Sequence, residues 1–152
     1  MEPPLDHVIH RMKYAGCSGL TRPLARLVAK AIPVPRGDGV TAVPLHRTRR
    51  RERGYNQADL LAKELAGTWG IPHLPDLLCR QRSTRTQARL DEDDRRANLS
   101  GAFHIGHPSW VSHRSWILVD DVVTTGNTLN ECLEGLRGSG ARAAVPVAVA
   151  LA

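Results

Sequence analysis

The residues best suited to chemistry lie in residues 116–129, which read WILVDDVVTTGNTL. Four apolar residues precede a pair of aspartates, Asp120 and Asp121. Such carboxylates only accept hydrogen bonds, which suits two adjacent sugar hydroxyls. A glycine permits a tight turn after the pair, and the free amides of a helix start favour an anion. The phosphate-binding candidates are Thr124, Thr125, Gly126, Asn127 and Thr128. The pattern predicts a phosphate cradle beside a diol-binding pair, as a ribose 5-phosphate site requires.

An ordinary strand–turn–helix with a threonine or asparagine cap is the alternative interpretation of this segment. Two adjacent carboxylates that leave a buried strand repel each other, so they are a poor structural choice unless something neutralises them. Other phosphate-binding motifs do not fit, since the sequence contains neither GxxxxGK[ST] nor a GxGxxG that opens a helix. The pattern therefore favours a ribose-phosphate ligand.

The elements that must position this segment alternate between apolar strands and amphipathic helices, which predicts an α/β fold with a mostly parallel sheet flanked by helices. Ligands of such sheets bind at the carboxyl ends of the strands. The arginine-rich residues 47–53 are expected to form a basic loop, and Pro146 suggests an edge strand or a bulge. Helices are expected over residues 20–31, 56–67 and 127–137, and strands over 40–45, 77–78, 102–105, 116–119 and 145–151.

The composition indicates one domain. The chain has 152 residues, 41% of them hydrophobic, and a net charge of +6 that favours anionic partners. Cys17, Cys79 and Cys132 lie far apart, so we expect neither structural zinc nor a disulfide framework. The start of the chain does not read as a signal peptide, and no stretch is apolar enough to cross a bilayer, so a cytoplasmic location is expected.

Residues 116–129 resemble the motif by which type I phosphoribosyltransferases bind phosphoribosyl diphosphate (PRPP): four hydrophobic residues, two acidic residues, TTG and a further threonine. The RGYNQ run at 53–57 and the VPL run at 43–45 resemble the competence protein F (ComF) subgroup. This resemblance spans about residues 11–150. Members of the subgroup usually begin with a four-cysteine zinc ribbon, which is absent here, so a short member and a trimmed N-terminus both stay open.

The resemblance implies a single phosphoribosyltransferase-like domain over residues 1–152, with a helical hood at 1–38 and a PRPP-binding core at 39–152. Asp120, Asp121 and Arg82 are the implied catalytic group, and Mg²⁺ is the implied cofactor, reached by the aspartates through water. The implied diphosphate loop contains Leu45, His46, Arg47 and Arg53, and the implied flexible loop contains Thr84, Gln87 and Arg95. A solvated charged loop at 47–53 and a disordered surface loop at 80–98 are the alternatives.

Two classes of function stay open. The first is an enzyme that transfers phosphoribose from PRPP to an unidentified acceptor and releases diphosphate. The second is a non-catalytic component of DNA uptake that responds to PRPP or a nucleotide, with single-stranded DNA or a competence protein as its partner. Glu2 stands where a glutamine-hydrolysing enzyme would need a cysteine, so a complete amidophosphoribosyltransferase is not expected. No membrane partner is expected, a homodimer stays open, and Glu131 and Glu134 are expected on the solvent face of their helix.

Overall fold

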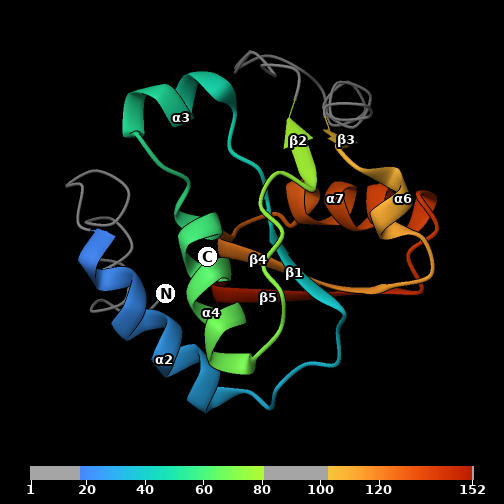
Figure 1. The fold of residues 1–152 in the computed structure, drawn as a ribbon. Helices are drawn as coiled ribbons and strands as arrows, with labels where there is room; N and C mark the ends of the chain where they lie inside the picture. Colours follow the sequence, from blue (N-terminus) through green and yellow to red (C-terminus); the bar gives the residue numbers. More distant parts are fainter. Residues whose placement is uncertain (1–17, 81–102, 152) are drawn as a thin grey trace.

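The centre of the molecule is a parallel sheet of three strands. The computed structural model of the chain describes residues 18–80 and 103–151. Strands β1 (Gly39–Ala42), β4 (Ser115–Val123) and β5 (Ala143–Leu151) pair in the order β1-β4-β5, with β4 in the centre (Figure 1). Strands β2 (Leu78–Arg80) and β3 (Phe103–Ile105) form a separate antiparallel pair. The predicted α/β fold with a mostly parallel sheet is confirmed.

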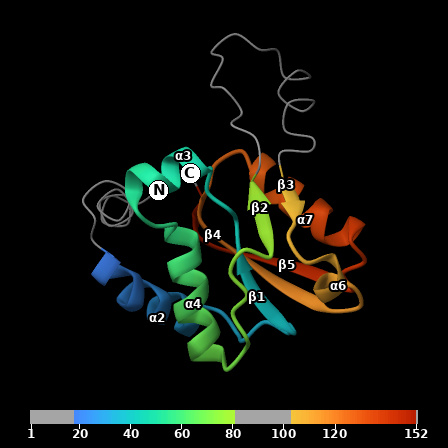
Figure 2. The same ribbon diagram turned by 45° about the horizontal axis from the view of Figure 1, so that its top comes forward.

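Helices cover both faces of the sheet. Successive side chains of β4 point to opposite faces, so each face carries apolar side chains that a helix must cover. Ile117 and Val119 pack with helices α2 (Thr21–Ala31) and α4 (Gln57–Trp69) on one face. Trp116 and Leu118 pack on the other face with helix α7 (Asn127–Gly138) and with β2. Figures 1 and 2 show this arrangement, with α2 and α4 on one side and α7 on the other. All four of these β4 side chains are almost completely buried.

Helix α4 begins and ends where the sequence predicts. The side-chain oxygen of Asn56 accepts a hydrogen bond of 3.2 Å from the Ala58 N–H, so Asn56 is the N-cap. Leu61 and Leu65 are fully buried on the face that packs against the sheet. The helix ends at Gly70, whose φ of 69° lies in the left-handed region that glycine adopts without strain.

Residues 47–53 are a helix, so the prediction of a basic loop is wrong. Helix α3 (Arg47–Arg53) begins after His46, whose ring Nδ1 accepts the Thr48 N–H at 3.2 Å. It ends at Gly54, which has a φ of 79°. A side-chain cap and a left-handed glycine are ordinary helix boundaries. Residues 47–53 are mostly charged and have no apolar face, so they lack the apolar periodicity by which a helix is predicted from sequence.

Four smaller features complete the described fold. A short 3₁₀ helix, η1 (Ser18–Leu20), precedes α2, and the sequence did not predict the short helix α6 (Pro108–Val111). Strand β4 continues past Val119 to Val123, so the aspartate pair lies inside the strand near its carboxyl end. Pro146 lies in β5, an edge strand of the described sheet, as predicted.

Candidate phosphoribosyl site

A cavity of about 260 Å³ lies where the carboxyl ends of β1 and β4 meet. Six segments form its walls: the loop after β1, helix α3, the start of α4, the end of β2, the end of β4 and the turn that leads into α7. Polar and charged side chains predominate in the lining, as an anionic ligand requires. We call it the Asp120 cavity. Its charged lining residues are Arg49, Arg53, Arg80, Asp120 and Asp121.

The two aspartates are held by their own backbone. Asp120 Oδ1 accepts the N–H of Asp121 at 2.8 Å, and Asp121 Oδ1 accepts the N–H of Val122 at 2.8 Å. Both side chains are half-buried and line the Asp120 cavity. The carboxylates therefore enter the cavity in fixed orientations, which suits the recognition of a rigid diol.

The segment after β4 forms an anion cradle at the start of α7. Gly126 has a φ of 75°, and this left-handed turn brings the chain into the helix. The Asn130 N–H donates to the Gly126 carbonyl at 2.8 Å as the helix begins. In the described structure no side chain caps this helix, so its first amides remain directed at the cavity side of the turn. A phosphate placed there would gain both these amides and the helix dipole.

Three arginines from two elements line the same cavity as the cradle. Arg49 and Arg53 are four residues apart on α3 and share one helix face. Arg53 Nη1 donates to Gln57 Oε1 at 3.4 Å, which links α3 to the first turn of α4. Arg80 ends β2, and its Cζ lies 5.1 Å from the centre of the Phe103 ring. Guanidinium groups are suited to bind the oxygens of a diphosphate.

Burial lowers the pKa of Arg80, and the positive charge of Arg49 lowers it further. Cys132, when ionised, and the Glu131 carboxylate act in the opposite direction. An anionic ligand in the cavity would oppose both of the lowering effects, because it favours the charged form of Arg80 and screens it from Arg49. The electrostatics of the Asp120 cavity thus favour a polyanionic ligand.

Most of the predicted site residues that the structure describes come together. Leu45, Arg53, both aspartates and residues 124–128 all line the Asp120 cavity. His46 instead caps α3, and Arg47 is the first residue of that helix. The predicted loop residues lie outside the described part of the chain: Arg82, Thr84, Gln87 and Arg95.

Sequence reasoning did not place Arg49, Asn56 or Arg80 at this site. Arg49 would have been found by treating 47–53 as a helix, because it then shares a face with Arg53. Asn56 also lines the cavity, and its side-chain amide ties α4 to the carbonyl of Val43 at 3.0 Å. Arg80 gives no local signal, since its position depends on the pairing of β2 with β3.

A second cavity, of about 490 Å³, lies on the other side of the loop after β1. It shares Pro44, Leu45, Asn56 and Arg80 with the Asp120 cavity. Its charged groups have partners within the protein: Arg50 pairs with Asp76 at 3.2 Å, and Asp59 with His73 at 3.0 Å. The anion cradle belongs to the smaller cavity alone, so the smaller cavity is the better candidate site.

The described residues offer no ready chelating group, because no cluster of three or more histidine, cysteine, aspartate or glutamate side chains occurs among them. Asp120 and Asp121 supply two carboxylates, which suits a Mg²⁺ ion bound mainly through ligand phosphates and water. None of the helices in the described ranges has the length and apolar character needed to cross a bilayer.

Comparison with known proteins finds relatives in bacteria. The chain is 39% identical over 145 residues to competence protein F of Haemophilus influenzae, covering 90% of this chain and 63% of that protein. It is 35% identical over 148 residues to DNA utilization protein YhgH of Escherichia coli K12, covering 93% and 64%. The chain thus spans slightly less than two thirds of these relatives. No family model matches it.

Solved structures share the fold. Glutamine PRPP amidotransferase from B. subtilis has a TM-score of 0.60 at 19% identity, covering 85% of this chain and 26% of that one. UMP synthase of Leishmania donovani has a TM-score of 0.52 at 16% identity, covering 95% and 29%. Identities this low show the fold alone. The chain therefore has the type I phosphoribosyltransferase fold and is a homologue of competence protein F and DNA utilization protein YhgH, which confirms the predicted resemblance.

Proposed function

We propose that the chain binds PRPP in the Asp120 cavity and transfers its phosphoribosyl group to an acceptor, with release of diphosphate. The observation that carries this proposal is that one cavity brings together the aspartate pair, the uncapped start of α7 and three arginines. Each suits a different part of PRPP. The 5-phosphate fits the cradle at residues 124–128, the ribose hydroxyls fit Asp120 and Asp121, and the diphosphate fits the arginines.

The reaction would break the bond between the anomeric carbon and the diphosphate oxygen while the acceptor forms a bond to that carbon. Positive charge develops on the sugar, as in glycoside hydrolysis, and negative charge develops on the leaving diphosphate. Asp120 and Asp121 would hold the ribose, and Arg49, Arg53 and Arg80 would stabilise the departing anion. Mg²⁺, when bound to PRPP oxygens, would neutralise part of the diphosphate charge. Residues 1–38 are the proposed hood for the acceptor.

Diphosphate release tests this proposal. The chain is incubated with PRPP, Mg²⁺ and a panel of nucleobases and amines, and the diphosphate released is measured for each acceptor. Samples without acceptor, and samples of the Asp120→Asn/Asp121→Asn variant, report hydrolysis and contamination. Diphosphate release that occurs only with an acceptor present, and only in the protein that retains both aspartates, supports phosphoribosyl transfer. PRPP binding without release from any acceptor would contradict it.

A second candidate function is a non-catalytic role in DNA uptake in the cytoplasm, and it draws on the words competence and DNA utilization in the names of the relatives. In this case PRPP or a nucleotide would bind the Asp120 cavity as a signal, and single-stranded DNA or a competence protein would be the partner. Binding of PRPP that changes the affinity for single-stranded DNA, without diphosphate release, would support this role. Identical DNA affinities with and without PRPP would contradict it.

A further inference from the structure

Helix α6 carries an exposed aromatic side chain. Trp110 is 48% exposed, whereas every other tryptophan, tyrosine and phenylalanine in the described ranges is buried or half-buried. An indole ring is a large apolar surface that gains free energy when a partner covers it. The exposure of Trp110 therefore indicates a contact surface at this helix.

His107 stacks on the ring of Trp110. The two ring centres lie 4.6 Å apart with their planes inclined by 23°, and the Trp110 N–H donates to the His107 carbonyl at 3.0 Å. Both residues are exposed, so this short turn presents two stacked rings to solvent. Rings of this kind suit a nucleobase, because every base has a π face that stacks on an aromatic side chain.

Two exposed arginines contact the segment that follows the ring pair. Arg114 Nη1 donates to the carbonyl of Trp110 at 3.2 Å, and the Arg142 N–H donates to the carbonyl of Arg114 at 2.8 Å. The Arg142 guanidinium donates twice to the carbonyl of His113, from Nε at 3.1 Å and from Nη2 at 2.7 Å. Guanidinium groups fixed in this way are suited to bind phosphate oxygens.

The surface formed by these residues is positively charged. We call His107, Trp110, Arg114 and Arg142 the α6 surface. Asp38 approaches it, with Oδ2 3.9 Å from Arg142 Nη2, and the same oxygen accepts the Ser115 N–H at 2.7 Å. The Arg142 side chain is 68% exposed, so an ion pair this long contributes little. Two arginines beside one aspartate leave a net positive charge, in a chain whose own net charge is +6.

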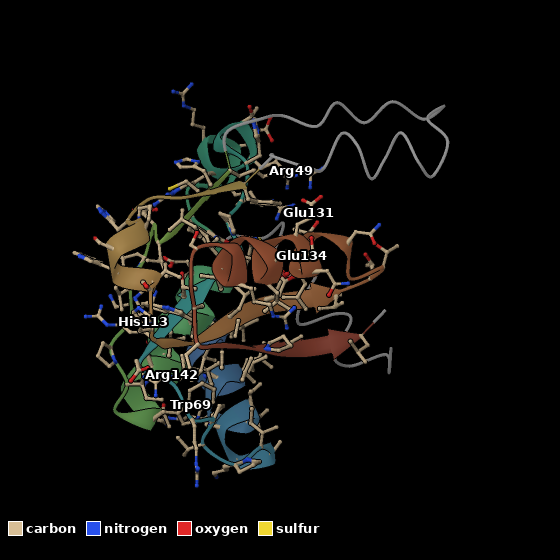
Figure 3. The ribbon with its side chains drawn as sticks, turned by 90° about the vertical axis from the view of Figure 1, so that its right-hand side faces the viewer. Arg49, Trp69, His113, Glu131, Glu134 and Arg142 are labelled. Atoms are coloured by element: carbon tan, nitrogen blue, oxygen red, sulfur yellow. The ribbon has the colours of Figure 1, made fainter. Side chains whose placement is uncertain are left out.

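The α6 surface lies at the opposite edge of the sheet from the Asp120 cavity. Arg114 and Arg142 immediately precede β4 and β5, whereas the cavity lies at the carboxyl ends of β1 and β4. Figure 3 shows His113 and Arg142 close to each other and well away from Arg49, which lines the cavity. The α6 surface and the cavity share no residue, so a ligand on one does not occupy the other.

We propose that the α6 surface binds single-stranded nucleic acid, with a base stacked on the rings of Trp110 and His107 and neighbouring phosphates on Arg114 and Arg142. Stacking on these rings needs an unpaired base, because the bases of a duplex are already stacked on one another and cost free energy to extrude. An acidic peptide would use the arginines alone. The proposal does not depend on phosphoribosyl transfer, and it gives the DNA-uptake role a binding surface separate from the PRPP site.

Binding of labelled oligothymidylate at low salt, followed by fluorescence anisotropy, tests the stacking. We expect Trp110→Ala to weaken this binding at least about tenfold, and Trp110→Phe to stay within about threefold of the wild type because a ring remains. An abasic strand of the same length carries the phosphates without the bases. The wild type and Trp110→Ala should therefore bind the abasic strand equally, whereas a general loss of structure would weaken both ligands.

The salt dependence of the same binding tests the arginines. Arg114→Ala and Arg142→Ala should each reduce the slope of log K against log salt concentration by about 0.7, because each arginine neutralises one phosphate of a single strand. Arg26→Ala is the matched control, since Arg26 is an exposed arginine of α2, which packs on the other face of the sheet. It removes the same charge and should leave the slope unchanged.

Three outcomes would overturn the α6 surface: unchanged oligothymidylate binding by Trp110→Ala, tighter binding of a duplex than of a single strand by the wild type, and losses confined to the arginines of α3. A wild-type chain that binds oligothymidylate through Trp110 but does not bind PRPP would support the α6 surface and overturn the proposed function. A wild-type chain that binds PRPP but no oligothymidylate would do the reverse.

Discussion

The side-chain amide of Asn56 donates a hydrogen bond of 3.0 Å to the carbonyl of Val43, while its oxygen caps α4 through the Ala58 N–H. One residue thus fixes the loop after β1 against the start of α4, where both form the wall of the Asp120 cavity. We expect Asn56→Ala to lower the free energy of unfolding by about 1–3 kcal/mol, because a cap and a part-buried hydrogen bond are both lost. Urea unfolding measures this change. Thr68→Ala, at an exposed helix position, is the control, and an equal loss in both variants would contradict the role of Asn56.

Two glycines offer a matched pair for packing. A Cβ atom at Gly39 would lie 2.5 Å from Cζ3 of Trp116 and 3.0 Å from Cδ1 of Leu74, whereas one at Gly67 would meet nothing within 4 Å. We expect Gly39→Ala to destabilise the chain by about 1–3 kcal/mol, because β1 would move away from β4. Gly67→Ala lies inside α4 and should stabilise it by roughly 0.5–1 kcal/mol. Thermal unfolding that ranks the two variants the other way would contradict the packing described for β1.

The arginines of α3 should differ in their effects on PRPP. Arg49 and Arg53 line the Asp120 cavity, Arg51 is exposed elsewhere on the helix, and Arg50 pairs with Asp76. Arg49→Ala and Arg53→Ala should each weaken PRPP binding by about 1.5–3 kcal/mol, and Arg51→Ala should change it little. Binding to PRPP and to single-stranded DNA is measured for each variant.

Equal small losses of DNA binding across these variants, with PRPP binding intact, would instead favour the DNA-uptake function. In that case each arginine neutralises one backbone phosphate, so each substitution flattens the salt dependence of DNA binding by about one counterion. The two functions therefore predict different patterns from the same set of proteins.

Cysteine reactivity tests the interior near α7. Burial raises the pKa of Cys132 far above its ordinary range, and the charge of Asp120 raises it further. We expect iodoacetamide at pH 8 to spare Cys132 in the folded chain and to modify it once urea unfolds the protein. Peptide mapping reads each site separately. Cys79 is half-buried and serves as the comparison, so faster modification of Cys132 than of Cys79 would contradict the packing of α7 against the sheet.

Local patterns in the sequence predicted most of the elements, because α4 and α7 carry apolar residues at helical spacing and β4 contains four consecutive apolar residues, 116–119. The motif at 120–128 predicted the centre of the site, because its chemistry is contained in one continuous segment. Helix α3 was missed since its charged residues give no apolar periodicity. Arg80 was missed because its place in the cavity wall depends on the pairing of β2 with β3, which neighbouring residues do not encode. The prediction of a solvent-facing side chain is confirmed for Glu134, which is exposed, and is wrong for Glu131, which is half-buried.

Calorimetry of PRPP binding with Mg²⁺, comparing the wild type with the Asp120→Asn/Asp121→Asn variant, tests the central claim most directly. Asparagine has nearly the shape of aspartate but lacks the charge and is a weaker acceptor for sugar hydroxyls. Both proteins should unfold at similar temperatures, and the variant should bind PRPP at least about tenfold more weakly, because two charge-assisted contacts are lost. Equal PRPP affinity in the two folded proteins would contradict a phosphoribosyl site at the Asp120 cavity.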